Sequence, residues 1–217
     1  RKNSDTFEET NYLSLFISGV DKAENWQSKP KKTDFYDMKR MVLKVLNGLG
    51  IHQFQTNLLV NNKRLAYGLS LSVNDIVLAE FGLIHPKIGK AMDVRNEVYY
   101  GEINLDKLYE LTTSNIQLKP INKFPTVTRD LAFVLDKNIA YTQLEGIGKK
   151  MGYPLLSSMT MFDHYDNEKH VGEGKKSIAL RFVFEDGTKT LTDQDIDQKM
   201  KSLIDCYSEE LGAILRS

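Results

Sequence analysis

The sequence lacks most of the features that mark secreted and membrane proteins. Its 217 residues include one cysteine, Cys206, so an internal disulfide framework is excluded and a reducing compartment is favoured. It contains no run of 18 apolar residues, and we therefore expect no membrane span. The chain starts at Arg1 with neither a methionine nor a signal-peptide pattern, so we expect it to be a piece of a longer protein.

The sequence also lacks an excess of charge of either sign. It contains 29 basic and 29 acidic residues, and both parts are close to neutral: residues 1–118 hold 15 basic and 14 acidic residues, and residues 119–217 hold 14 and 15. A strongly basic domain, the usual electrostatic mark of a nucleic-acid-binding protein, is therefore absent. Charge alone favours the view that no nucleic acid is bound.

The stretch from Lys123 to Leu135 is the clearest strand in the sequence. Pro125 has no N–H and biases the residue before it toward extended geometry, so the stretch begins at a boundary. Bulky apolar residues then alternate with a carboxylate, a small residue and a valine: Leu131, Phe133 and Leu135 against Asp130, Ala132 and Val134. This period of two predicts a half-buried strand with its bulky side toward the core.

Residues 1–118 show the pattern of an α+β module. Residues 1–10 are polar and are predicted to be frayed. Strands are predicted at 12–19, 54–60, 65–73, 75–81 and 97–105, and helices at 35–49, 86–92 and 106–111. Asp34 and Asp106 are the predicted N-caps of the first and last helix. With Thr112–Gln117 as a polar linker, this part is predicted to be mostly antiparallel strands with two or three helices.

Residues 119–217 follow the order βαββαβ. After the opening strand, a helix is predicted at 141–151, strands at 155–165 and 175–184, a helix from 192 to 212 and a last short strand at 213–216. The stretch 166–174 is predicted to be a polar turn. Thr192 and Asp195 have the spacing of a capping box. This order is the ferredoxin-like arrangement.

Three groups of residues have some features of chemical sites, but each is better explained by structure. Gly174-Lys-Lys-Ser177 lacks the glycine that a phosphate-binding loop needs five residues earlier, and a strand rather than a helix follows it. His85, before Pro86, is best explained as a histidine bonded to nearby backbone. The cluster Asp163, His164, Asp166, Glu168 and His170 matches neither zinc nor calcium spacing. We therefore predict no catalytic residues and no metal site.

Six segments together resemble the C-terminal part of the β subunits of bacterial phenylalanyl-tRNA synthetases. They are Phe35-Tyr-Asp-Met-Lys, Gly82-Leu-Ile-His-Pro, Lys123-Phe-Pro-Thr-Val-Thr-Arg-Asp-Leu-Ala-Phe-Val, Phe162-Asp-His-Tyr, Gly174-Lys-Lys-Ser and Thr190-Leu-Thr-Asp-Gln-Asp. They occur in the family's order and span nearly the whole chain. By this resemblance, residues 1–118 are similar to the end of a class II synthetase-like module that has lost its active site, and residues 119–217 resemble the ferredoxin-fold anticodon-binding domain.

The resemblance implies a non-catalytic part of a cytoplasmic ligase. In the family, an α2β2 enzyme joins phenylalanine to tRNA(Phe) with ATP and Mg²⁺, and the α subunit does the chemistry. No cofactor is expected in this fragment. The sequence agrees, because strand 97–105 runs into Asp106-Lys-Leu-Tyr without the glycine–arginine cluster with which class II enzymes hold the nucleotide. The implied partners are tRNA(Phe), the α subunit and a second β subunit, and no membrane.

The strand alternation of residues 119–217 places the expected RNA contacts on one sheet face. If Met159 and Met161 face the core, the outward residues of the three long strands are Asp130, Ala132, Phe162, His164, Ser177, Ala179 and Arg181. Small residues admit a base, Phe162 offers a stacking surface and Arg181 a phosphate contact. In an alternative interpretation, Asp130 and Arg181 form a structural ion pair across the sheet.

Two other functions remain open for the ferredoxin-like part. It can be a small-molecule-sensing domain, or a protein-interaction module without RNA binding, which the near-zero net charge supports. RNA binding measured at varied salt separates these from the RNA-binding interpretation, because only phosphate neutralisation gives a salt slope.

Overall fold

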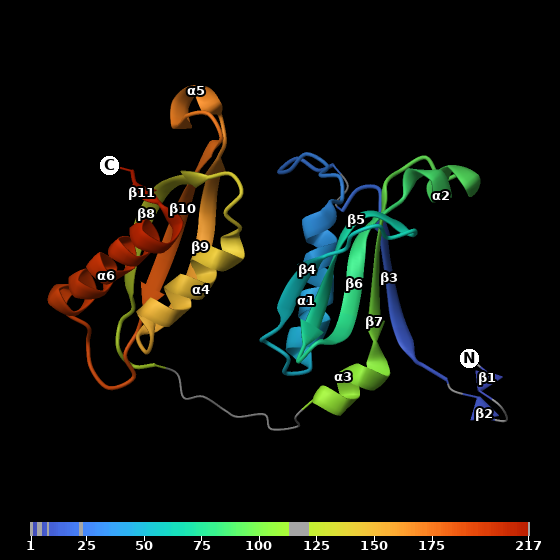
Figure 1. Cartoon of the computed structure of the whole chain (residues 1–217), viewed down its shortest axis with the longest axis horizontal. Coiled ribbons are helices and arrows are strands. Elements are labelled where there is room, and N and C mark those ends of the chain that lie inside the picture. Colours follow the sequence, from blue (N-terminus) through green and yellow to red (C-terminus); the bar gives the residue numbers. More distant parts are fainter. Residues whose placement is uncertain (1, 4–5, 8, 22–23, 113–121, 217) are drawn as a thin grey trace. The chain divides into compact units, whose positions relative to one another are not determined.

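The computed structural model describes every residue except 1, 4–5, 8, 22–23, 113–121 and 217. The chain divides into two compact units, Arg1–Gln117 and Leu118–Ser217, here called unit 1 and unit 2. Each has its own hydrophobic core and its own antiparallel sheet (Figure 1). Both are α+β, as predicted. Most of the predicted linker Thr112–Gln117 lies outside the described residues.

Unit 1 is built on a five-stranded antiparallel sheet with the order β3-β7-β6-β5-β4. Its strands are β3 (Tyr12–Ser18), β4 (Gln55–Leu58), β5 (Leu65–Val73), β6 (Ile76–Ile84) and β7 (Val98–Asn104). Its helices are α1 (Phe35–Gly48), α2 (Pro86–Ala91) and α3 (Leu105–Leu111). The predicted frayed start is wrong in part, because β1 (Lys2–Asn3) pairs with β2 (Thr6–Phe7) in a small ribbon.

Helix α1 covers one face of the unit 1 sheet (Figure 1). Asp34 caps it as predicted, in a capping box completed by Asp37. Met38, Val42 and Leu46 follow at helical spacing and are fully buried in the core of unit 1.

The predicted cap of α3 is wrong by two residues. The side chain of Asn104 accepts the cap hydrogen bond from the backbone of Lys107. Asp106 already lies inside the helix, and its carboxylate accepts hydrogen bonds from the backbone and side chain of Asn11. Both asparagine and aspartate are good N-caps, so the sequence did not distinguish them.

Unit 2 has a four-stranded antiparallel sheet with the order β11-β8-β10-β9. Its elements are β8 (Val127–Asp136), α4 (Tyr141–Gly152), β9 (Leu156–Tyr165), α5 (Glu168–Val171), β10 (Lys175–Phe184), α6 (Asp193–Leu211) and β11 (Ile214–Leu215). The βαββαβ order is confirmed, and this strand order is the ferredoxin-like one. The one element missed was α5, a single turn inside the predicted polar turn.

Helices α4 and α6 pack side by side on one face of the unit 2 sheet (Figure 1). The capping box of Thr192 and Asp195 is present at the start of α6, as predicted. Deep in the core, the hydroxyl of Tyr207 donates a hydrogen bond to the carbonyl of Leu144, which ties the two helices together. The other face of this sheet is not covered by any helix among the described residues of unit 2.

No helix in the part of the chain that the structure describes is long and apolar enough to cross a membrane.

Candidate RNA-binding face

The uncovered face of the unit 2 sheet, here called the open face, is defined by strand register. Asp130, Ala132 and Val134 of β8 lie directly opposite Arg181, Ala179 and Ser177 of β10. Directly opposed residues in antiparallel strands project to the same side. The neighbouring residues Phe133, Leu135, Ile178 and Leu180 are buried against the helices. The predicted face assignment of β8 and β10 is therefore confirmed.

Small side chains form the middle of the open face. Ala132 and Ala179 face each other and are half-buried, and Ser177 is only 5% exposed. Ser177 lies between Val134 of β8 and Tyr165 of β9, its two register partners. These bulkier neighbours account for its burial. The centre of the open face thus consists of short side chains close to the sheet backbone, with larger side chains around it.

The edge strand β9 carries a bulge that the sequence did not reveal. Ala179 pairs with Asp163 but Leu180 pairs with Met161, so Phe162 is the extra residue between them. Phe162 is 51% exposed and its ring lies beside Arg181, which places it on the open face as predicted.

The same bulge makes the prediction for His164 wrong. His164 lies opposite Ile178, a core residue, so it projects to the helix side of the sheet at an exposed position. Asp163 instead lies opposite Ala179, on the open face. A strict alternation of two along β9 cannot hold on both sides of an extra residue.

Arg181 makes two contacts across the open face. Its Nε and Nη2 donate to the two carboxylate oxygens of Asp130, at 2.9 and 2.7 Å. Its guanidinium also lies over the ring of Phe162, 4.9 Å from the ring centroid, within the range of a cation–π contact. The ion pair considered as an alternative is therefore present. It leaves three of the five guanidinium N–H groups for another acceptor.

The ion pair affects both titrating groups. The hydrogen bond from Arg181 holds the pKa of Asp130 below its usual value, and the carboxylate raises the pKa of Arg181. Both groups therefore remain charged near neutral pH. Chemically, the open face offers an aromatic ring, a fixed guanidinium, a carboxylate and a central area of short side chains. That combination suits an unstacked base better than the phosphate backbone alone.

Two residues near the end of the chain also lie on this face. Ile214 of β11 is opposite Val134, and the backbone N–H of Arg216 donates to the carbonyl of Ala132. Strand alternation therefore puts Ile214 and Arg216 on the side of Ala132 and Val134. The sequence predicted a short strand there, and counting its register against β8 is the step that finds them.

The other candidate sites behave as structural features. Lys175 pairs with Asp136, and Lys176 donates to the carbonyls of Lys137 and Ile139, so both lysines of the Gly174 turn bind their own chain. The ring of His85 accepts a hydrogen bond from the backbone N–H of Lys87, at the start of α2. Among the described residues, no group of three His, Cys, Asp or Glu side chains could hold a metal ion.

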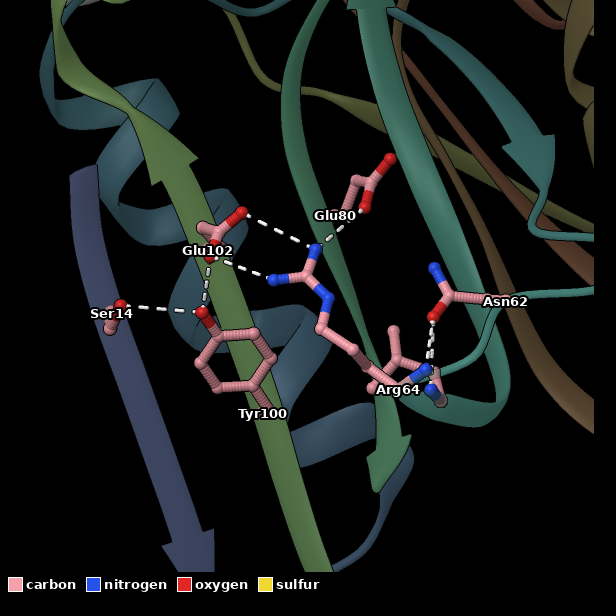
Figure 2. A network of polar contacts seen from close by, with 7 residues as sticks. Ser14, Asn62, Arg64, Glu80, Tyr100 and Glu102 are labelled. Atoms are coloured by element: carbon pink, nitrogen blue, oxygen red, sulfur yellow. Dashed lines mark hydrogen bonds and ion pairs between the residues drawn. The ribbon is translucent and has the colours of Figure 1, made fainter. Parts of the chain in front are cut away.

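A second polar face lies in unit 1, on the side of the sheet opposite α1 (Figure 2). Arg64 reaches over β6 and β7 and donates to Glu80 and Glu102. Tyr100 donates to Glu102 as well, and its ring is 5.8 Å from the Arg64 guanidinium. Burial alone would raise the pKa of Glu102, but the hydrogen bonds from Tyr100 and Arg64 outweigh it and hold this pKa below its usual value. The Arg64 charge is thus already opposed by two carboxylates.

Two protein families match the chain, one over each unit. Residues 1–105 match the model described as the phenylalanyl tRNA synthetase beta chain CLM domain, and residues 122–216 match the ferredoxin-fold anticodon binding domain. The chain belongs to the family of phenylalanine–tRNA ligase β subunits. The β subunit of Bacteroides thetaiotaomicron is 36% identical over 216 residues, covering 97% of this chain and 26% of that protein. The β subunit of Bacillus subtilis is 30% identical over 210 residues, covering 96% of this chain and 26% of that protein.

The family membership confirms the resemblance drawn from the six sequence segments. The chain spans about a quarter of the length of the ligase β subunits that it matches, 26% in each of these two. The ferredoxin-fold model covers β8 to β11 and therefore the whole open face.

Proposed function

We propose that this chain takes part in the ATP-dependent joining of phenylalanine to tRNA(Phe), with unit 2 binding the anticodon region of the tRNA. The observation that carries the proposal is the open face, on a domain that matches an anticodon-binding family. Its contact residues are Asp130, Ala132, Phe162, Ser177, Ala179 and Arg181, together with Ile214 and Arg216 at the adjoining edge.

The chemistry of the open face suits bases that are splayed out of a loop. The short side chains of Ala132 and Ala179 let a base approach the sheet closely. Phe162 stacks on the base, and stacking needs little net charge, which agrees with the neutrality of unit 2. The free N–H groups of Arg181 and the carboxylate of Asp130 are placed to bind base edges as donor and acceptors.

Unit 1 is proposed to be a non-catalytic scaffold for the α subunit and for a second β subunit. The Arg64 charge is opposed by Glu80 and Glu102, so it is a poor partner for a triphosphate. ATP and Mg²⁺ belong to the whole enzyme. Several large apolar side chains remain exposed on unit 1, among them Trp26 at 94% and Phe16 at 63%. Exposed apolar surface of this kind favours a partner interface.

The test is a tRNA-binding measurement on the purified chain. Affinity for a tRNA(Phe) transcript is measured across a range of salt concentrations, beside a transcript whose anticodon has been replaced. Tighter binding of the unaltered transcript at every salt concentration is expected. Equal affinity for both transcripts, or no salt dependence at all, contradicts anticodon recognition by unit 2 and favours a small-molecule or protein partner.

A further inference from the structure

The exposed side of α1 gathers positive charge in an otherwise neutral chain. Six of the 15 basic residues of the first 118 fall between positions 29 and 44, namely Lys29, Lys31, Lys32, Lys39, Arg40 and Lys44. Only two acidic residues, Asp34 and Asp37, lie in the same stretch. The connector before α1 and the helix itself therefore carry a local excess of positive charge.

Helical spacing puts the cations of α1 on one side of it. The inward side is Met38, Val42 and Leu46, all fully buried. The outward side repeats every four residues through Tyr36, Arg40 and Lys44, flanked by Lys39, Leu43 and Asn47. A shallow hollow runs along these residues, and no carboxylate is among the described side chains that line it. Tyr36 is 73% exposed.

The connector adds to the same surface through a shared carboxylate. Asp37 is buried, and its side chain lies 2.8 Å from the guanidinium of Arg40 and 3.7 Å from the ammonium of Lys31. Lys31 also pairs with Asp34 at 3.0 Å. Lys31 and Arg40 thus converge on one point, so the basic connector continues the basic side of the helix.

Folding alone does not call for this arrangement. The apolar stripe and the capping box already account for α1. Arg40 and Lys44 are four residues apart, and like charges at that spacing destabilise a helix. Asp37 is the one carboxylate within α1, and it is engaged in the cap as well as with Arg40. A polyanion on the outside removes the repulsion.

We propose that Lys31, Tyr36, Lys39, Arg40 and Lys44, here called the α1 basic face, bind the phosphate backbone of the tRNA. The inference rests on the proposed function, and it means that unit 1 contacts the same tRNA that unit 2 binds. Lys31 and Arg40 are already paired with Asp34 and Asp37, but Lys39 and Lys44 make no ion pair with a described carboxylate, so these two lysines suit a chain of phosphates. The exposed ring of Tyr36 in the same hollow suits a ribose or base. An acidic protein surface is the rival occupant.

The test compares two pairs of charge-removing substitutions in the whole chain. One variant carries Lys39→Gln and Lys44→Gln on the α1 basic face. The control carries Lys87→Gln and Lys90→Gln on α2, which removes the same charge from another helix of unit 1. Glutamine is a good helix former, so both variants should keep their helices. Each is titrated with tRNA(Phe) transcript from about 50 to 200 mM salt, the range over which counterion release is large.

The expected result is a smaller salt slope for the α1 variant alone. Each lost phosphate contact reduces the slope by about 0.7 to 0.9, so the pair should lower it by roughly 1.5. Its affinity should fall several-fold at low salt and approach that of the unaltered chain at high salt. The control should match the unaltered chain.

Three results overturn the inference. An unchanged salt slope in the α1 variant would mean that Lys39 and Lys44 make no phosphate contact. An equal loss of tRNA affinity in the α1 variant and the α2 control would mean that positive charge anywhere on unit 1 attracts the RNA, rather than the α1 basic face in particular. An unchanged slope with weakened binding of the α subunit assigns the face to a protein partner. If the chain also binds the transcript with the replaced anticodon as tightly as the unaltered one, the proposed function itself is wrong. If the anticodon still matters and only the salt slope of the α1 variant is unchanged, anticodon recognition by unit 2 stands and only the α1 contact is wrong.

Discussion

The carboxylate of Asp130 accepts two hydrogen bonds from the guanidinium of Arg181, at 2.9 and 2.7 Å. The two residues lie directly opposite each other on β8 and β10. Held in this way, the guanidinium lies over the ring of Phe162 of β9, with its central carbon 4.9 Å from the ring centroid. Three strands are therefore coupled on the open face, and RNA affinity should depend on the shape of the Arg181 side chain as well as its charge.

Replacing Arg181 with lysine tests that dependence. Lysine keeps the charge but has neither the planar group nor the two-pronged contact to Asp130. We expect tRNA affinity to fall about two- to fivefold, the scale of an exposed cation–π contact. The control is Arg129→Lys, which makes the same change on the helix side of β8, where Arg129 pairs with Asp193. An equal loss in both variants would assign the effect to charge or stability rather than to the open face.

Two of the glycines of α4, Gly146 and Gly148, are expected to respond to alanine in opposite ways. A Cβ at Gly146 meets no atom within 4 Å, so Gly146→Ala should stabilise unit 2 by about 0.5–1 kcal/mol through helix propensity. A Cβ at Gly148 lies 2.5 Å from Met159 Sδ and 2.8 Å from the Tyr207 hydroxyl. Gly148→Ala should therefore destabilise by roughly 1–3 kcal/mol. Urea unfolding measures both, and a gain in stability from Gly148→Ala would mean that α4 is less tightly packed than described.

Acid should weaken unit 2 in part through the cap of α6. The backbone N–H of Thr192 and the ammonium of Lys189 hold the pKa of Asp195 below its ordinary value of 3.8. Because the folded pKa is the lower one, this stabilisation is fully present above about pH 4 and is lost as the pH falls through the folded pKa. Asp195→Asn should lower the melting temperature at pH 7 and reduce its fall below pH 4. Asp197→Asn, at an exposed position of the same helix, should leave both unchanged.

The chain by itself should not activate phenylalanine. Activation needs positive groups placed around a triphosphate, and the sheet face of unit 1 instead pairs Arg64 with Glu80 and Glu102. We expect no phenylalanine-dependent exchange between ATP and pyrophosphate with purified chain free of α subunit. Exchange above the level of a mock preparation would contradict a non-catalytic unit 1.

Much of this fold follows from local patterns in the sequence. The period-two alternation around Phe133 located β8, one of the two central strands of unit 2, and its core side, because an alternating strand has only one way to bury its bulky residues. Asp34 and Thr192 located the starts of α1 and α6, because few residue types satisfy free N–H groups at a helix end.

The features that the sequence did not predict depend on pairing between strands. The bulge at Phe162 reverses the side of His164, and a bulge is defined by two strands together rather than by one. Arg216 reaches the open face only because β11 pairs with β8 in one particular register. The contact between Arg181 and Phe162 joins residues from neighbouring strands, so no spacing within either strand reveals it.

Replacing Phe162 tests anticodon-region binding by the open face most directly. Phe162→Ala removes the exposed ring from an edge strand and leaves the core of unit 2 intact. The matched control is Tyr153→Ala, which removes an exposed aromatic side chain at the end of α4. Both variants are checked for an unchanged melting temperature and then titrated with tRNA(Phe) transcript. We predict that Phe162→Ala weakens binding by about 1–3 kcal/mol, the usual contribution of a base stacked on an aromatic side chain, and that Tyr153→Ala has no effect. An unchanged affinity in folded Phe162→Ala would contradict RNA binding by the open face.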